Sequence, residues 1–427
     1  MRTPRLLRAR LVPAILAFGF AVAAAPARAG VIVVEGEGPV LLDAIDAAAE
    51  GDILLIKPGS SGGFLDSLTI DGKSLTLVVD GGTYTLGQLS VRNLAAGQQV
   101  TLRNLTLGPT LTPFSPIGSD SAALNVVDCA GAVWVDTCTL APPPTTPGLF
   151  GFSPHGLHGL TALNSQDVVV SDCTITGGHG TNESGSCGLP GYAASSPGGD
   201  GVHAKDSRVA LLRSTVTGGV GGAPGGACPQ NSKSAGGAGL HVLGAGSVHV
   251  SGCALTGAAN PGSSLQPGSG LVVDSAAGAV ALRGTTVAAG AGLPSQPAQV
   301  APAGTVTTYP AAPRGLQVTS PLRVGQSGEI SVQGVAGDTL ALFQSLQGAW
   351  LPFPGKQGVF LLAPNPGSLL LIAPNPTGTF VLPFNAPANV LGASQGLTVL
   401  LQVMVKNGSQ VTIEDVASCT LLDASIP

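Results

Sequence analysis

A short pattern of alternating apolar residues recurs six times in the middle of this 427-residue chain. Each copy places apolar residues at alternate positions, then a polar residue or glycine, and then a second short apolar alternation. The copies cover residues 100–107, 133–140, 168–175, 209–216, 248–255 and 280–287. Their ends are 32 to 41 positions apart, a spacing typical of repeat proteins whose units stack on one another.

The alternation slips by one residue near the middle of every copy. Period-two alternation predicts a half-buried strand, and a one-residue slip would turn its inward side chains outward unless the chain bends there. The slips fall at Asn104, Thr137, Asp172, Arg213, Gly252 and Gly284. Asn and Gly tolerate left-handed backbone angles, so they suit such bends. We therefore expect two strands meeting at a corner, preceded by a third short strand, as at 201–204 and 239–242.

One pair of short strands cannot bury its inner face, so successive copies must stack as coils. Parallel strands of neighbouring coils would lie about 4.8 Å apart. The first expected inward stack contains Leu105, Cys138, Cys173, Ser214, Cys253 and Thr285. The second contains Leu107, Leu140, Ile175, Val216, Leu255 and Val287.

The repeated part, residues 31–290, resembles the right-handed parallel β-helix proteins of the pectate-lyase-like family. A second feature supports this resemblance. Residues 41–50 have helical spacing and end at Gly51, before the apolar segment 53–59. The family often opens with such a short helix, which would cap the exposed core of the first coil. The resemblance implies an all-β fold with an N-terminal capping helix.

The repeat stops after residue 290. Residues 291–314 are rich in Pro, Ala and Thr and are interpreted as a linker. Short strand candidates separated by Gly, Pro and Asn turns follow over 315–427, which predicts a C-terminal antiparallel β-sandwich-like domain. The alternative is that some of these strands belong to one irregular sheet. This tail is similar to C-terminal domains of large bacterial secreted proteins, planctomycete ones especially.

The N-terminus has the pattern of a secretory signal peptide. Residues 1–29 place four arginines before an apolar run, Leu11–Ala25, and end on Ala27-Arg28-Ala29. Cleavage after Ala29 leaves 30–290 as the expected β-helix and changes the formal net charge from −5 to −10, because this segment holds five arginines and no acidic residue. We expect a secreted or cell-surface protein with no nucleic-acid partner and no membrane span in the mature chain. An uncleaved anchor is the alternative.

Two Gly/Ser/Pro-rich insertions, 177–200 and 218–238, lack apolar periodicity and are predicted to be loops. They leave successive coils at equivalent points, so they should lie side by side. Each carries one cysteine, Cys187 and Cys228, and a disulfide between them is an open possibility in an exported chain. The cysteines of the inward stack are expected to be reduced packing groups. No cysteine or histidine spacing indicates zinc.

The outward positions of the repeated strands carry little of what polysaccharide cleavage needs. Hydrolysis requires two carboxylates, and a lyase requires a base together with a group that stabilises negative charge. The outward residues on the strands before the corners are Thr101, Arg103, Trp134, Asp136, Val169, Ser171, Ala210, Leu212, His249, Ser251, Ala281 and Arg283. Because they include one carboxylate, we expect no active site on this face.

The densest polar group is Asp200, His203, Lys205 and Asp206, with His241 expected one coil above His203 and with His155 and His158 as candidates for the position below it. A histidine stack beside two loops has the chemistry to bind a sugar or a metal, whereas the alternative is that these residues cap strand ends. His203, His241, Lys205 and Asp206 are therefore the binding candidates. Asp200 and His203 are catalytic candidates as well.

His179 is a further catalytic candidate, because Gly178-His179-Gly180 matches a tripeptide of polygalacturonase-type hydrolases. The other motifs of those enzymes are absent from the sequence, and so are metal-binding repeats that would support calcium. We expect no cofactor. The preferred hypothesis is a non-catalytic structural or glycan-binding β-helix protein whose partners are polysaccharides or cell-surface components. The alternative is a polysaccharide lyase or glycoside hydrolase with its site near 177–200 and 218–238.

Overall fold

The computed structural model describes the chain in segments that begin at Ala29. They are residues 29–36, 40–60, 67–108, 122–143, 155–182, 195–223, 234–259, 267–292, 295–309, 314–352, 356–363, 367–372, 379–386, 391 and 395–427. The predicted signal peptide up to residue 28, and the possible disulfide between Cys187 and Cys228, lie outside the described residues. Within these segments, no helix is both long enough and apolar enough to cross a membrane.

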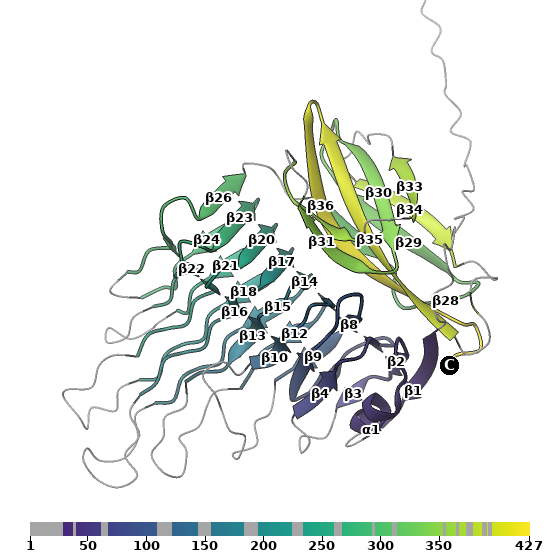
Figure 1. The fold of residues 1–427 in the computed structure, drawn as a ribbon, viewed down its shortest axis with the longest axis horizontal. Coiled ribbons are helices and arrows are strands. Elements are labelled where there is room, and N and C mark those ends of the chain that lie inside the picture. The colour runs from purple at the N-terminus through teal and green to yellow at the C-terminus, as the bar shows by residue number, and fades with distance from the viewer. Residues whose placement is uncertain are drawn as a thin grey trace, which may run out of the picture.

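The first two thirds of the chain form a parallel β-helix built from three sheets, whose strands stack coil upon coil (Figure 1). The first sheet contains β1 (Ala29–Val34), β2 (Ile53–Ile56), β5 (Leu75–Val79), β8 (Gln99–Arg103), β11 (Ala132–Asp136), β14 (Asp167–Ser171), β17 (Arg208–Leu212), β20 (Ser247–Ser251), β23 (Ala279–Arg283) and β26 (Val306–Tyr309). The second contains β4 (Ser67–Asp71), β7 (Gln88–Arg92), β10 (Ala122–Val127), β13 (His158–Leu163), β16 (Val202–Lys205), β19 (Leu240–Leu243), β22 (Leu271–Val273) and β25 (Gln299–Val300). The third contains β3 (Gly59–Ser60), β6 (Tyr84–Leu86), β9 (Leu105–Leu107), β12 (Thr139–Leu140), β15 (Thr174–Thr176), β18 (Thr215–Thr217), β21 (Ala254–Thr256) and β24 (Thr286–Ala288).

The corners between the first and third sheets lie at the residues where the sequence alternation slips. All six have left-handed backbone angles: φ is 60° at Asn104, 56° at Thr137, 52° at Asp172, 45° at Arg213, 65° at Gly252 and 49° at Gly284. Non-glycine residues adopt such angles rarely. The prediction of two strands meeting at a left-handed corner is therefore confirmed in each of the repeats.

The inward stack at these corners is a hydrogen-bonded ladder of sulfur and hydroxyl groups. The backbone N–H of Cys138 donates to Cys173 Sγ at 3.3 Å, and that of Cys173 donates to Ser214 Oγ at 3.1 Å. Ser214 continues the ladder to Cys253 Sγ at 3.3 Å, and Cys253 continues it to Thr285 Oγ1 at 3.4 Å. The three cysteines are buried and free, as predicted. Their small side chains satisfy corner N–H groups that would otherwise be buried without a partner.

The predicted capping helix is present as α1 (Val40–Ala47). Its Leu41 and Ile45 are buried against the core of the first coils. At the other end, the interpretation of 291–314 as a linker is wrong in part, because β25 pairs with β22 and β26 pairs with β23. The Pro, Ala and Thr content of this segment gives no clear strand pattern in the sequence. The backbone groups of β25 and β26 nevertheless form hydrogen bonds with the preceding coil, whose edge would otherwise be unpaired.

The segments predicted as loops at 177–200 and 218–238 begin and end in an ordered layer of extended, glycine-rich chain, which we name the glycine layer (residues 177–182, 195–200, 218–223, 234–238 and 257–259). Gly199 donates to the carbonyl of Gly178 at 2.9 Å, Gly219 to Gly199 at 2.7 Å, and Gly237 to Gly219 at 2.8 Å. A Cβ atom at Gly219 would lie 2.0 Å from the carbonyl oxygen of Gly178. Only glycine allows segments to approach so closely, which explains part of the high glycine content.

The C-terminal part is a β-sandwich, as predicted. Its strands are β27 (Gly315–Val318), β28 (Leu322–Arg323), β29 (Ser327–Gln333), β30 (Thr339–Ser345), β31 (Gly348–Pro352), β32 (Val359–Leu362), β33 (Gly367–Ile372), β34 (Thr379–Asn385), β35 (Gln395–Asn407) and β36 (Gln410–Leu422). One sheet has the order β27–β29–β34, and the other contains β33, β30, β35, β36 and β28. Leu316, Ile330 and Val332 from the first face Leu342 and Val403 from the second in one apolar core.

The sandwich lies against the outward face of the first sheet (Figure 1). Trp134, Val169 and Ala210 of the β-helix share an apolar cluster with Trp350 and Phe360 of the sandwich. In addition, β1 pairs with β2 in parallel and with β35 in antiparallel orientation, so one continuous sheet joins the two parts. The outward face that we expected to lack an active site is thus largely an interface between domains.

Candidate functional site

The outward face of the second sheet carries one polar side chain at the same register position on six successive coils. This polar row consists of Thr69, Ser90, Asn125, Thr161, His203 and His241. The neighbouring inward row is entirely apolar and consists of Leu68, Leu89, Leu124, Leu160, Val202 and Leu240. Because strand side chains alternate between faces, the side chains of the polar row point away from the core. The row itself runs from coil to coil along the axis of the β-helix.

At one end of the polar row lies a cluster of His158, Asp200, His203, His241 and Asp274, which we name the histidine–aspartate cluster. It forms where the glycine layer joins the second sheet. Asp200 Oδ2 lies 3.0 Å from Nδ1 of His203 and 3.0 Å from Nδ1 of His241. The other oxygen, Oδ1, accepts a 2.8 Å hydrogen bond from the backbone N–H of Ala238. An ionised carboxylate only accepts hydrogen bonds, so both imidazoles direct an N–H at Asp200.

The histidine rings are arranged in a continuous stack. His158 and His203 are stacked with centroids 4.4 Å apart, and His241 meets His203 edge-on at 5.3 Å. The backbone N–H of Asp200 donates to His158 Nδ1 at 2.9 Å. That nitrogen therefore acts as a hydrogen-bond acceptor.

The hydrogen bonds within the cluster lower the pKa of Asp200 and raise the pKa of His241. Burial would raise the pKa of Asp200, but hydrogen bonds from His203 and His241 outweigh burial and hold the pKa well below its usual range. For His241, burial lowers the pKa, whereas the bonds to Asp200 and to Asp274 Oδ2, 2.9 Å from its Nε2, raise the pKa to about 9. At neutral pH the cluster thus contains an aspartate and an imidazolium.

His158, Asp200 and His203 bring ligand atoms to within 4.8 Å of one another, a spacing compatible with a metal ion. The hydrogen bonds of the cluster leave few of these atoms available. His158 Nδ1 accepts the N–H of Asp200, and Asp200 Oδ2 accepts from His203 Nδ1. A structural zinc ion requires four ligands, and calcium prefers oxygen atoms, so the donor set fits neither ion as it stands.

The remaining sequence candidates have other positions. Lys205 is exposed on the same strand as His203. Asp206 has a φ of 50° and accepts a 2.9 Å hydrogen bond from the backbone of Ala245, so it shapes a turn. His179 belongs to the glycine layer, where its Nδ1 accepts a 3.2 Å hydrogen bond from Val220 N–H. His155 is exposed before β13.

The structure confirms that His241 lies one coil above His203. Asp274 was missed as a site residue, although it follows β22, the strand paired with the one that carries His241. The available signal was that Asp274 directly follows β22, the strand next to the one that carries His241. Of the two histidines considered below His203, His158 stacks directly on it, although it occupies a different register position.

Comparisons with known proteins give little beyond the fold. No protein family model matches the chain, and no curated protein matches it. Among solved structures, the chain is similar to a mutant of a PL6-family alginate lyase, with 12% identity, a TM-score of 0.22, and coverage of 65% of this chain and 39% of that chain. This chain therefore corresponds to less than half the length of that structure, and a similarity at this TM-score carries no argument about function.

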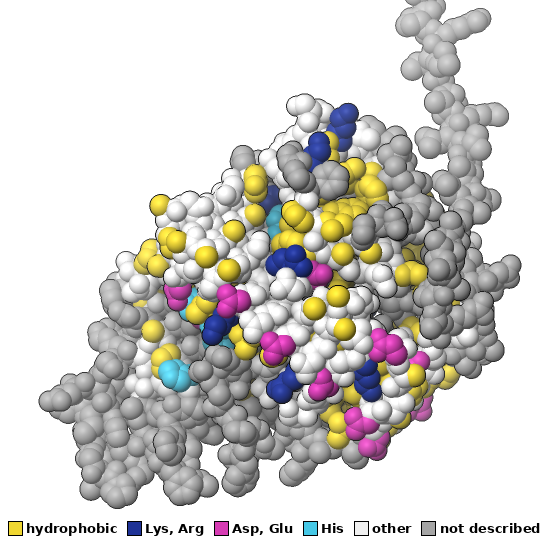
Figure 2. Space-filling view, in the orientation of Figure 1, with side chains coloured by type: hydrophobic (Ala, Val, Ile, Leu, Met, Phe, Trp, Pro, Cys, Tyr) yellow, Lys and Arg dark blue, Asp and Glu magenta, His cyan; other side chains and the backbone are white. Residues whose placement is uncertain are grey.

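The visible surface gives no sign of a polyanion-binding patch. Figure 2 shows that, on the face it displays, basic side chains are scattered: those in the lower part stand near acidic ones, and a small group near the top stands apart from them. Recognition of nucleic acid would require a concentrated basic surface.

Proposed function

We propose that this chain is an extracellular protein that binds polysaccharide along the outward face of the second sheet without cleaving it. The observation that supports this proposal is the polar row, which places one hydrogen-bonding side chain per coil from Thr69 to His241. Thr69, Asn125 and His241 reach the surface, while Ser90, Thr161 and His203 are buried between them. The outward face of the first sheet is not equivalent, because the sandwich covers much of it.

The row suits an extended, hydroxyl-rich ligand. Its members repeat at the strand spacing of about 4.8 Å, along a surface whose backbone is fixed by sheet hydrogen bonds on both sides. His203 and His241 are held further by Asp200. Binding groups that are already ordered lose little conformational entropy when a ligand binds. We therefore place the tightest contacts at the His203 and His241 end, where Lys205 and Asp274 are exposed.

A second candidate function, polysaccharide β-elimination, is favoured by the environment of His203. Its Nδ1 is directed at Asp200, while no hydrogen bond from Nε2 to another described residue is present. An aspartate on one nitrogen leaves the other as a base. In this reaction Nε2 removes the proton beside a uronate carboxylate, the C–H electron pair forms a carbon–carbon double bond, and the glycosidic oxygen leaves and takes a proton from water.

Hydrolysis fits the cluster less well. It needs one carboxylic acid and one free carboxylate across the scissile bond. Asp200 is buried, ionised and bonded to two histidines and a backbone N–H, which removes it from both roles.

The test uses the chain from residue 30 to residue 427 and a panel of insoluble and soluble neutral and uronate polysaccharides. Pull-down measures binding, and ultraviolet absorbance of unsaturated ends measures elimination. His203→Gln removes the base and alters the stack, whereas His155→Gln changes an exposed histidine before β13, the strand that pairs with β16. Binding without product, lost in His203→Gln and kept in His155→Gln, supports the binding function. Product formation that His203→Gln abolishes supports the lyase instead, and neither binding nor product contradicts both.

A further inference from the structure

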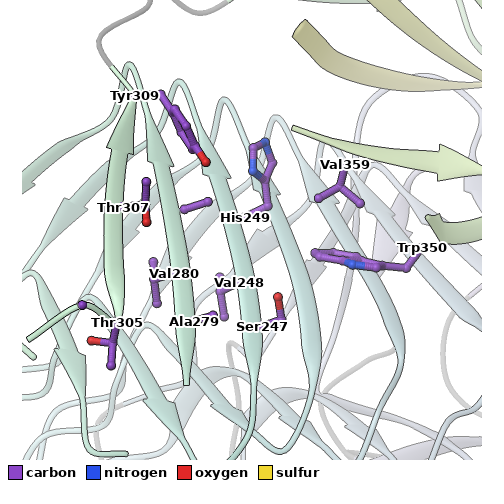
Figure 3. A pocket seen from close by; sticks show the side chains of 12 residues that line it. Ser247, Val248, His249, Ala279, Val280, Thr305, Thr307, Tyr309, Trp350 and Val359 are labelled. Carbon is purple, nitrogen blue, oxygen red and sulfur yellow. The ribbon is translucent and has the colours of Figure 1, made fainter. Parts of the chain in front are cut away.

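A cavity of about 150 Å³ lies where the sandwich leaves the surface of the β-helix. The β-helix contributes strands β20 and β23 and the segment from Gly304 to Tyr309, while β31 and β32 of the sandwich contribute Trp350 and Val359 (Figure 3). We name it the junction cavity. A dry cavity of this size accommodates one six-membered ring.

The floor of the junction cavity exists because small side chains lie between larger ones. The middle strand, β23, presents Ala279 and Ala281 outward. On one side Ala281 is paired with His249 of β20, and on the other side with Thr307 of β26. The row that continues through Ala210 and Trp134 is covered by the sandwich, and the cavity opens where this cover ends.

Aromatic rings and hydroxyl groups form the walls. Figure 3 shows the His249 ring between those of Tyr309 and Trp350, with the hydroxyl of Thr307 on the neighbouring strand. Indole and phenol rings combine a large apolar face with a polar edge. None of the twelve lining residues is Asp, Glu, Lys or Arg. The cavity therefore favours an uncharged ligand with both an apolar face and hydroxyl groups.

His249 is the decisive observation. The residue is only 4% exposed, yet no hydrogen bond joins either ring nitrogen to a described residue. Burial, and then the positive charge of Arg283, lowers the pKa of His249 to about 4, so the ring is neutral near pH 7. A neutral imidazole has one donor and one acceptor. The two nitrogens are not among the fully buried polar atoms, so they reach the accessible space of the cavity, where the hydroxyl groups of a ligand would bond to them.

We propose that the junction cavity is a binding subsite for a single neutral pyranose ring, such as the end of a glycan chain, with the ring against Trp350 and its hydroxyl groups bonded to His249. The polysaccharide-binding function proposed above motivates the choice of ligand class, but this subsite is separate from the polar row. The uncharged, hydroxyl-bearing walls favour a sugar ring over a purely aromatic ligand or a uronate.

Trp350 also provides the readout, since it is one of two tryptophans in the chain and the other, Trp134, is buried under the sandwich. The experiment titrates the full chain with methyl glucoside, methyl galactoside, methyl mannoside, glucuronate and phenol, and follows tryptophan fluorescence. Ala281→Leu fills the floor, and His249→Phe keeps a ring but removes its nitrogens. The matched control is Ala254→Leu, the same change on the third sheet, in the coil that carries His249.

We expect saturable binding of at least one neutral pyranoside, with affinity on the order of 1 mM and weaker binding of glucuronate and phenol. Ala281→Leu and His249→Phe should each lower that affinity roughly tenfold or more, and Ala254→Leu should leave it within about twofold. The proposal is overturned if no pyranoside gives a saturable change, if phenol alone binds, or if the cavity variants bind as the control does. Retention of pyranoside binding in His203→Gln separates this subsite from the polar row.

Discussion

Ser418, on strand β36 of the sandwich, donates a 2.7 Å hydrogen bond from its hydroxyl to Asp136 Oδ2 on strand β11 of the β-helix. Asp136 is 3% exposed and also forms an ion pair with Arg103, which in turn donates to the Ser418 carbonyl at 2.9 Å. Replacing Asp136 by Leu would leave Arg103 as a buried charge without its carboxylate. We expect a loss of about 3 kcal/mol in the free energy of unfolding.

Urea unfolding of Asp136→Leu measures this loss, and limited proteolysis reports whether the sandwich separates from the β-helix. The control is Asp71→Asn, since Asp71 is an exposed carboxylate on β4 of the second sheet, which shares no strand with the sandwich. The control should change stability by less than about 0.5 kcal/mol. Equal effects of the two variants would contradict a structural role for the pair of Ser418 and Asp136.

The close packing of the glycine layer predicts that protein stability depends strongly on side-chain size at its glycine positions. In Gly219→Ala, the new methyl group would lie 2.0 Å from the Gly178 carbonyl oxygen, so the backbone must move. Overpacking of this kind costs about 1–3 kcal/mol. In the control, Gly59→Ala, the nearest atom is Tyr84 Cε2 at 3.8 Å, which is an ordinary contact. That change should be neutral or stabilise by up to about 1 kcal/mol, because alanine restricts the unfolded chain. Urea midpoints of the two variants that shift in the same direction would contradict the ordered layer.

His249 predicts a stabilising substitution. His249 is 4% exposed, and burying a polar imidazole costs free energy that phenylalanine does not incur, so His249→Phe should raise the free energy of unfolding of the ligand-free protein. The pKa of about 4 in the folded state lies below the unfolded value near 6.5. Between these values the unfolded state binds more protons, so stability falls as pH decreases, by up to about 3 kcal/mol.

The measurement is thermal unfolding of wild type and His249→Phe between pH 4 and pH 7. The advantage of the variant should increase as pH decreases, because phenylalanine removes the proton-binding difference. Parallel stability curves over this range would show that His249 is not buried in its neutral form.

The coils were predictable because their geometry depends on local pattern. Strand alternation, the slip at Asn104 and the five equivalent positions, and the stacked cysteines all follow from residues within one repeat. The polar row and its cluster could be predicted from the sequence only in part. His203 and His241 could be aligned because both occur at the same place in their coils, whereas Asp274 is joined to them by a side-chain contact that no repeat pattern encodes.

The position of the sandwich was not predictable for a different reason. Ser418 and Asp136 are 282 residues apart, and neither has a sequence pattern that points to the other. The same applies to the junction cavity, whose walls come from β26 and β31. The outward position of Trp134 was a signal in retrospect, because a large aromatic side chain on an exposed strand face generally has a covering surface.

The histidine–aspartate cluster predicts a protonation window set by His241. Its folded pKa of about 9 lies above the unfolded value near 6.5, so the folded state retains a proton between these values that the unfolded state has lost. The contribution to stability is therefore complete below about pH 6.5 and is lost as pH rises through about 9. Nuclear magnetic resonance of the His241 Cε1–H signal follows this titration directly.

Asp274→Asn tests the cause of the shift. Removing one of the two carboxylates should lower the pKa of His241 while Asp200 keeps it above 6.5, because the Nδ1 contact at 3.0 Å remains. Asp206→Asn is the matched control, since Asp206 serves a turn and accepts from the backbone of Ala245. An unchanged His241 titration in Asp274→Asn, or an equal decrease in both variants, would contradict the clamp of His241 between two carboxylates. A decrease in Asp274→Asn alone would establish that Asp274 belongs to the site that the sequence pattern had missed.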